Sequence, residues 1–129
     1  MNMIIALGLD IVDVHRMIDL YHRYGERALN RLVGSEERML FERRSDKGLF
    51  LAGRFAAKEA VIKTLAGILE SRPRFSDIQI LPDDTGKPVV KLPPELANEL
   101  NGYRWMISIT HEKSMAAAAA ILIKDQLLE

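Results

Sequence analysis

The first candidate for chemistry is Glu59, which lies in a stretch of small and apolar residues. The run FLAGRFAAKEAVIK at 50–63 has the length and composition of a helix. Because residues three and four apart on a helix are neighbours, Glu59 faces the same side as Phe55 and Lys63. Spacing alone favours a plain amphipathic helix with a Glu59–Lys63 ion pair. The other interpretation is a metal or phosphate site, for which small neighbours leave room: Ala56, Ala57 and Ala60.

The second candidate is Asp10, which interrupts an almost continuous apolar run from residue 3 to residue 12. Such a run predicts a strand that is buried on both faces. A carboxylate inside such a strand is costly unless it is ionised and coordinated, or paired. The alternative is that Asp10 is a turn residue after Gly8, and the local pattern leaves both interpretations open.

A modest phosphate-binding signal comes from the sequence Gly-Lys-Pro at 86–88, which places a cation beside a flexible backbone. The residues on either side, 77–81 and 89–92, alternate polar and apolar side chains, which predicts a β-hairpin. A plain hairpin loop with a solvated lysine is the more ordinary interpretation. His111, in the turn 110–114, is by itself as typical of a solvated surface as of a binding site.

The elements that must position these residues follow from capping and turn signals. Asp13 is expected to cap a helix ending near Gly25, and Ser35 to cap a second helix. Ser45 or Asp46 could begin the helix over 50–63. A short helix begins at residue 94, and strands are predicted at 105–110 and 115–123. The order of strand, helices, hairpin, helix and hairpin predicts an α+β fold, with an antiparallel sheet packed with helices.

Composition restricts the class of protein. The 129 residues predict one domain, 1–129, and 48% hydrophobic content is enough for a core. The net charge is zero and the chain has no cysteine, which argues against nucleic-acid binding, disulfides and thiolate metal sites. The N-terminal residues lack the basic region of a signal peptide, and no apolar run reaches the ~20 residues that span a bilayer. A soluble cytoplasmic protein with no membrane partner is expected.

Four motifs, in order along nearly the whole chain, carry a family resemblance: GLDIV at 8–12, FLAGRFAAKEA at 50–60, GKP at 86–88 and SITH at 108–111. Together they resemble the holo-[acyl-carrier-protein] synthases, the small single-domain branch of the phosphopantetheinyl transferases. The Arg-Phe-Ala-Ala-Lys-Glu-Ala run is the most specific part. The chain departs from the family's pattern at 67–73, where GILESRP replaces a glycine-rich link. The resemblance therefore leaves the contacts of this loop open.

The resemblance implies transfer of 4′-phosphopantetheine from coenzyme A to a serine of acyl carrier protein, a step of fatty acid biosynthesis, with release of 3′,5′-ADP. It implies that Asp10 and Glu59 bind Mg²⁺, which prefers oxygen ligands. Lys63 would reach the pyrophosphate as a point charge. Either Glu59 or a metal-bound water could take the serine proton. The coenzyme A contacts implied by the resemblance are Arg54, Lys63, Gly86, Lys87, Pro88, Ser108, Thr110 and His111.

Arg16, Arg23 and Arg27 recur at i, i+7 and i+11, which makes a narrow stripe if the helix continues through Gly25. Such a stripe is usually a solvated face. The resemblance implies that it is the docking surface for the acidic recognition helix of carrier protein.

A homotrimer with active sites between subunits is expected on two grounds. A small α+β domain has few helices to cover its sheet, and large exposed apolar faces usually mark interfaces. Trp105, Ile107 and Ile109 lie on one side of their strand, and the strand at 115–123 is apolar on both sides. One face of this sheet is therefore expected to stay exposed, and the resemblance implies three subunits. A monomer whose helices cover both faces is the alternative. Two other functions stay open from the residues: a metal-dependent phosphohydrolase of a nucleotide-like pyrophosphate, and a non-catalytic oligomeric interaction module.

Overall fold

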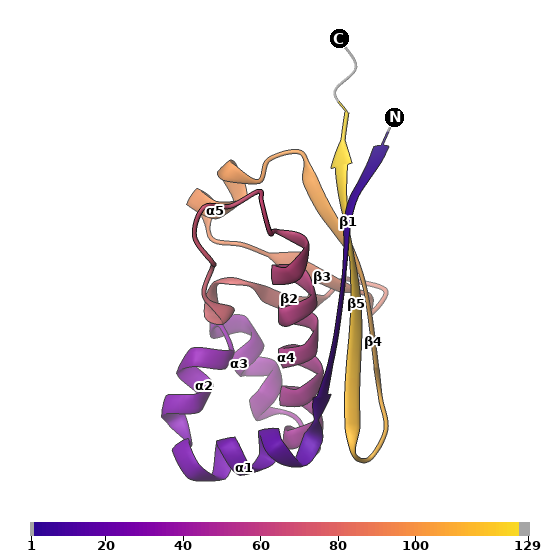
Figure 1. Ribbon diagram of the computed structural model, residues 1–129. Helices are drawn as coiled ribbons and strands as arrows, with labels where there is room; N and C mark the ends of the chain where they lie inside the picture. The colour runs from indigo at the N-terminus through magenta and orange to yellow at the C-terminus, as the bar shows by residue number, and fades with distance from the viewer. Residues whose placement is uncertain (1, 127–129) are drawn as a thin grey trace.

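A long helix packed along one face of a three-stranded antiparallel sheet forms the centre of the molecule (Figure 1). The structure, a computed structural model, describes residues 2–126. The helix is α4 (Lys47–Thr64), and the sheet has the strand order β1 (Asn2–Asp13), β5 (Met115–Asp125) and β4 (Tyr103–His111). The predicted α+β class is therefore confirmed. The two ends of the predicted domain, residues 1 and 129, lie outside the described residues.

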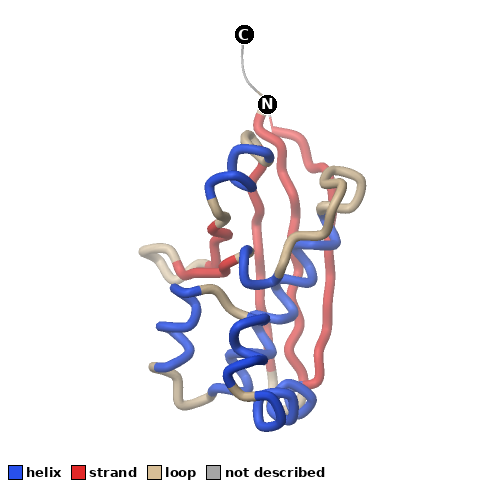
Figure 2. The backbone as a smooth tube through the Cα atoms, turned by 90° about the vertical axis from the view of Figure 1, so that its left-hand side faces the viewer, coloured by secondary structure: helices blue, strands red, loops and turns tan. Residues whose placement is uncertain are grey.

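Shorter elements complete the fold around α4, as the two views at right angles show (Figures 1 and 2). The predicted β-hairpin is confirmed, because β2 and β3 pair in antiparallel register. No helix within residues 2–126 is both long enough and apolar enough to cross a membrane. The remaining elements are α1 (Val14–Tyr24), α2 (Glu26–Leu32), α3 (Ser35–Glu42), the 3-10 turn η1 (Phe75–Asp77), β2 (Gln79–Pro82), β3 (Pro88–Lys91) and α5 (Pro94–Glu99).

Gly8 lets α4 lie directly on β1. A Cβ atom built at Gly8 would lie 2.0 Å from the carbonyl oxygen of Ala60, so a side chain cannot fit there. The matching residues of α4 are also small, since Ala56, Ala57 and Ala60 are fully buried. The alanine-rich run thus allows α4 to pack closely on the sheet. This packing fixes the position of α4 relative to β1.

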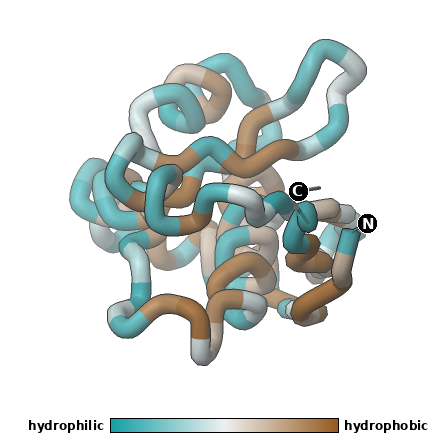
Figure 3. Tube along the Cα trace, turned by 90° about the horizontal axis from the view of Figure 1, so that it is seen from above, coloured by the Kyte–Doolittle hydropathy of each residue, from teal (hydrophilic) through white to brown (hydrophobic). Residues whose placement is uncertain are grey.

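The face of the sheet turned away from α4 is apolar and exposed. On β1, Leu7, Leu9 and Ile11 are 61–65% exposed. The prediction that this strand is buried on both faces is therefore wrong for the single chain. Seen from above, the trace next to the N label includes a hydrophobic stretch at one side of the molecule (Figure 3). The same face continues through the paired residues of β5 and β4: Ile121, Ala119 and Ala117, and then Met106, Ser108 and Thr110.

The apolar side of β4 faces inward instead. Trp105, Ile107 and Ile109 are partly buried and pack against the core. The indole N–H of Trp105 donates a hydrogen bond of 2.9 Å to Oγ1 of Thr64 on α4. The exposed face is therefore not the one that carries these three residues, and β1 supplies most of it.

Helix boundaries agree with three of the predictions from capping and turn signals and correct one. Asp13 caps α1 by accepting hydrogen bonds from the amides of residues 15 and 16, and Asp46 precedes α4. Gly34, not Ser35, is the N-cap of α3, and its amide donates to the Glu37 carboxylate. Gly25 has a φ of 50°, which ends α1 and begins α2, so the helix does not continue through it.

Candidate active site

Asp10 and Lys63 meet where β1 crosses α4. The Nζ atom of Lys63 lies 3.3 Å from Oδ1 of Asp10 and donates a hydrogen bond of 2.7 Å to the carbonyl oxygen of Leu9. The other carboxylate oxygen, Oδ2, is buried and has no hydrogen-bond partner among residues 2–126. A buried carboxylate oxygen without a hydrogen-bond partner is unfavourable, so this oxygen is suited to coordinate a cation.

Glu59 lies one helical turn before Lys63 but pairs with a different cation. Nη2 of Arg72 donates a hydrogen bond of 2.7 Å to Oε1 of Glu59. The predicted Glu59–Lys63 ion pair is wrong, because Lys63 reaches across to β1. The space expected around the alanines beside Glu59 is also filled, since the backbone of Gly8 packs against Ala60. Each of the two carboxylates therefore has its own basic partner within the chain.

A buried ion pair behind this cluster was not predicted. Glu37 and Lys58 are fully buried and paired at 2.5 Å. Lys58 also donates to the carbonyl oxygens of Leu32 and Phe75, while Oε2 of Glu37 accepts from the amide of Ile80. Burial lowers the pKa of Lys58, although the Glu37 carboxylate opposes that change. The pair ties α4 to the elements on either side of it: α2, α3, η1 and β2.

A second cluster surrounds a cavity of about 240 Å³. Four residues implied by the resemblance line it: Arg54, Gly86, Pro88 and His111. The Arg54 guanidinium lies 4.5 Å from the centre of the Phe50 ring, and its Nε lies 4.0 Å from Glu37 Oε2. The pKa of Arg54 is lowered, mainly because its guanidinium is buried. The Glu37 carboxylate opposes this change and the nearby Arg44 adds to it. Arg44 also lines the cavity, so two guanidinium groups and an imidazole face it.

The other residues implied for coenzyme A are not in this cavity lining. Ser108 and Thr110 lie on the outer face of the sheet, since they alternate with the inward-facing residues of β4. Lys87 is in the hairpin turn, where its amide donates a hydrogen bond of 3.0 Å to Oδ1 of Asp83. The structure thus brings together only part of the predicted set within one chain.

The two clusters lie on opposite sides of α4. Arg54 and Lys63 are nine positions apart, which is about 2.5 turns at 3.6 residues per turn, so their side chains leave the helix in opposite directions. The sheet separates the clusters in the same way, because Asp10 is on one edge strand and His111 is on the other. A single chain therefore carries two half-sites that do not face each other.

The three arginines predicted for docking line two adjoining grooves. Arg16 and Arg23, both on α1, line a groove of about 400 Å³. Arg27, on α2, lines a groove of about 420 Å³, and Leu20 and Tyr24 line both grooves. The condition for a single helical stripe is not met, because α1 ends at Gly25. The bend nevertheless leaves the three arginines on neighbouring grooves.

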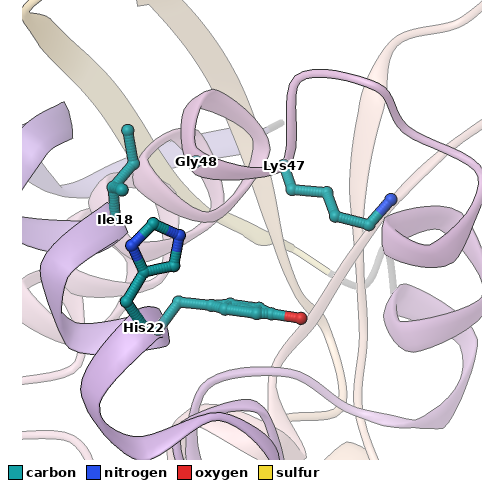
Figure 4. Close-up of a pocket in the computed structure, with 5 residues that line it drawn as sticks. Ile18, His22, Lys47 and Gly48 are labelled. Carbon is teal, nitrogen blue, oxygen red and sulfur yellow. The ribbon is translucent and has the colours of Figure 1, made fainter.

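Another cavity, of about 260 Å³, lies between α1 and the beginning of α4 (Figure 4). Its lining includes Ile18, His22, Lys47 and Gly48. None of the residues singled out from the sequence lines it. This cavity is therefore separate from both half-sites.

Comparison with known proteins assigns a family to the chain. Residues 6–121 match the model of the 4′-phosphopantetheinyl transferase superfamily. A holo-[acyl-carrier-protein] synthase from Alkalilimnicola ehrlichii is 40% identical over 93% of this chain and 97% of its own length. One from Natranaerobius thermophilus is 38% identical over 95% of this chain and 100% of its own.

Solved structures show the same fold. The holo-[acyl-carrier-protein] synthase of Neisseria meningitidis superposes with a TM-score of 0.81 at 30% identity, covering 93% of this chain and 98% of its own. The Bacillus anthracis structure, in complex with coenzyme A (3′,5′-ADP), gives a TM-score of 0.77 at 28% identity. That comparison covers 95% of this chain and 99% of the other.

Proposed function

This chain belongs to the holo-[acyl-carrier-protein] synthases of the 4′-phosphopantetheinyl transferase superfamily, and from that premise we propose that it transfers 4′-phosphopantetheine from coenzyme A to a serine of apo-acyl carrier protein. 3′,5′-ADP is the other product. The observation that carries the proposal is the family match over residues 6–121, which spans Asp10, Glu59 and Lys63. The phosphohydrolase and the interaction module have no such support.

The reaction is a displacement at phosphorus. The serine oxygen forms a bond to the β-phosphorus of coenzyme A, the bond from that phosphorus to the bridging oxygen breaks, and 3′,5′-ADP leaves with the bonding electrons. The serine hydroxyl gives up its proton, and Glu59 is a carboxylate of this chain that can accept it. Lys63, oriented by Asp10 and the carbonyl of Leu9, places a positive charge where negative charge grows on the departing phosphate.

Asp10 and Glu59 would hold Mg²⁺. The fit rests on the donor set: two carboxylates on packed elements, one of which has a buried oxygen without a partner. Within residues 2–126, no three acidic or histidine side chains form a metal-binding group. Mg²⁺ commonly takes one or two carboxylates together with phosphate oxygens and waters, so two suffice. When bound, the ion neutralises charge on the pyrophosphate.

Coenzyme A would be held through its phosphates by the second cluster. Arg54 and His111 offer cationic and hydrogen-bonding groups to the cavity. Gly86, with a φ of 90°, and Pro88 shape the adjoining turn, and Lys87 lies between them. Ser108 and Thr110 would contribute hydroxyls from the outer face of the sheet.

We infer that the complete site forms between subunits of a homotrimer. Asp10, Glu59 and Lys63 of one copy would face Arg54 and His111 of a neighbour, because the two sets leave opposite edges of the sheet. Burial of the exposed apolar face of β1 supplies the driving force for association. Closed cyclic symmetry also leaves every half-site with a partner.

Acyl carrier protein would dock on the arginine-lined grooves of α1 and α2. Arg16, Arg23 and Arg27 present positive charge around the apolar side chains of Leu20 and Tyr24. This combination suits an acidic helix with an apolar contact residue. Local charge steers such an encounter even though the net charge of the chain is zero.

Incubation of the protein with apo-carrier protein, coenzyme A and Mg²⁺, followed by mass spectrometry, tests the proposal. The carrier should gain one 4′-phosphopantetheine group and 3′,5′-ADP should appear in equal amount. Asp10→Ala and Glu59→Gln should abolish the transfer while circular dichroism stays unchanged. Cleavage of coenzyme A without a carrier would indicate a phosphohydrolase instead, and no reaction would indicate a binding module.

A further inference from the structure

The carboxylate of Glu59 is engaged by a cation of the chain itself. Arg72 donates to Oε1 of Glu59 at 2.7 Å, from the segment that joins α4 to η1. We infer that Arg72 is a built-in competitor of the divalent cation at Glu59, so that a cation binds there only by weakening or displacing this contact. The inference rests on the proposed function, because it takes Glu59 as a cation ligand.

Arg72 is held in this position by a second contact. Its guanidinium carbon lies 5.7 Å from the centre of the Phe75 ring, within the range of a cation–π interaction. Phe75 in turn packs on Phe55 of α4, with ring centres 5.2 Å apart. Phe55 is one helical turn before Glu59. The aromatic pair therefore places the guanidinium beside the carboxylate rather than leaving it in open solvent.

The contact is nevertheless easy to exchange. The side chain of Arg72 is 61% exposed, whereas that of Glu59 is only 19% exposed. An ion pair with one partner so accessible to water is weak, so the arginine can swing out into solvent while the cation takes its place beside the mostly buried Glu59 carboxylate. Lys63 differs, because it is bound to the Leu9 carbonyl as well as to Asp10. Of the two basic partners, Arg72 is thus the one that a cation would displace.

Arg72 stands at a place where the family resemblance does not predict an arginine. It lies in the segment 67–73, where the sequence departs from the glycine-rich link expected by resemblance. A glycine-rich segment offers no side chain to Glu59. The arginine would weaken cation binding relative to such a segment, and would keep the Glu59 carboxylate oriented until the cation arrives.

Titration of the full-length protein with Mn²⁺ alone, followed by electron paramagnetic resonance of the free ion, tests this inference. Arg72→Gln should bind Mn²⁺ about three- to fivefold more tightly than the unaltered protein, the gain expected from removing a weak ion pair. The matched control is Arg74→Gln, which removes the same charge from the same link between α4 and η1. Arg74 pairs with Asp77 and not with Glu59, so its Mn²⁺ affinity should stay unchanged.

The outcomes separate this inference from the proposed function. If Glu59→Gln weakens Mn²⁺ binding but Arg72→Gln binds no more tightly than Arg74→Gln, the competitor role is refuted and the cation site stands. If both arginine variants gain equally, the effect is general charge and the specific contact is again refuted. If Glu59→Gln binds like the unaltered protein, or nothing binds, the cation site of the proposed function fails and the inference fails with it.

Discussion

Replacement of Gly8 by alanine should separate β1 from α4 and disable the proposed site. The added Cβ would lie 2.0 Å from the carbonyl oxygen of Ala60 and 3.2 Å from Cγ2 of Thr64. The carbonyl belongs to the interior of a helix and cannot rotate away by itself. The strand or the whole helix must therefore shift.

The size of the shift sets the expected effect. The gap must widen by at least 1.0 Å, from 2.0 Å to the 3.0 Å below which Cβ contacts essentially never occur. Overpacking of a core costs about 1–3 kcal/mol, and a clash with backbone belongs at the upper end, so we expect a loss of about 3 kcal/mol. A misplacement of about 1 Å at a site can cost about 100-fold in rate. Asp10 and Lys63 lie on the two separated elements, so kcat/KM should fall by about that factor.

Urea unfolding and the carrier-protein transfer assay measure the two effects. Gly48→Ala is the matched control, because its Cβ would meet only the side chain of Ile18, 2.2 Å from Cγ1, which can change rotamer. The control should lose less stability and keep its transfer rate. A Gly8→Ala protein as stable and as active as the control would refute the close packing of α4 on β1 as the basis of the site.

The remaining predictions concern the buried pair, the docking surface and the outer face of the sheet. Lys58→Met should lower the free energy of unfolding, measured in urea titrations, by about 3–5 kcal/mol because Glu37 is left charged and buried. Adding Glu37→Leu to this variant should restore part of the lost stability. Arg16→Glu should weaken carrier-protein binding in a titration, with coenzyme A affinity unchanged and the effect shrinking as salt rises; an effect independent of salt would place docking elsewhere. Ile11→Glu should lower the mass seen by light scattering from three copies toward one, and an unaltered trimer would contradict the proposed interface.

The fold could be predicted where local signals and packing agree. Asp13 supplies a side-chain cap, the hairpin has its turn residues at 83–86, and the alanine-rich run has strong helix propensity. The sequence predicts a strand at 115–123 from its apolar partner strand, although alanine has a low strand propensity, and the pairing of β5 with β4 confirms it. These elements are specified by residues close together in the sequence, so local sequence patterns predict them.

The errors share one physical cause, which is that partners distant in sequence decide where a side chain goes. Spacing paired Glu59 with Lys63, but the structure pairs them with Arg72 and Asp10, respectively. Glu37 is a buried partner of Lys58, which no periodicity could indicate. The exposure of β1 depends on the number of helices that reach each face of the sheet, a property of the whole fold.

The proposed active site needs half-sites from two copies of the chain. Glu59→Gln disables one half-site and His111→Ala disables the other, so each variant alone should be inactive in the transfer assay. Equal amounts of the two, mixed after partial unfolding and reassembly, should regain activity at about one quarter of the sites, those with two intact halves. Demonstrably mixed trimers that stay inactive, or a monomer with full activity, would contradict the claim.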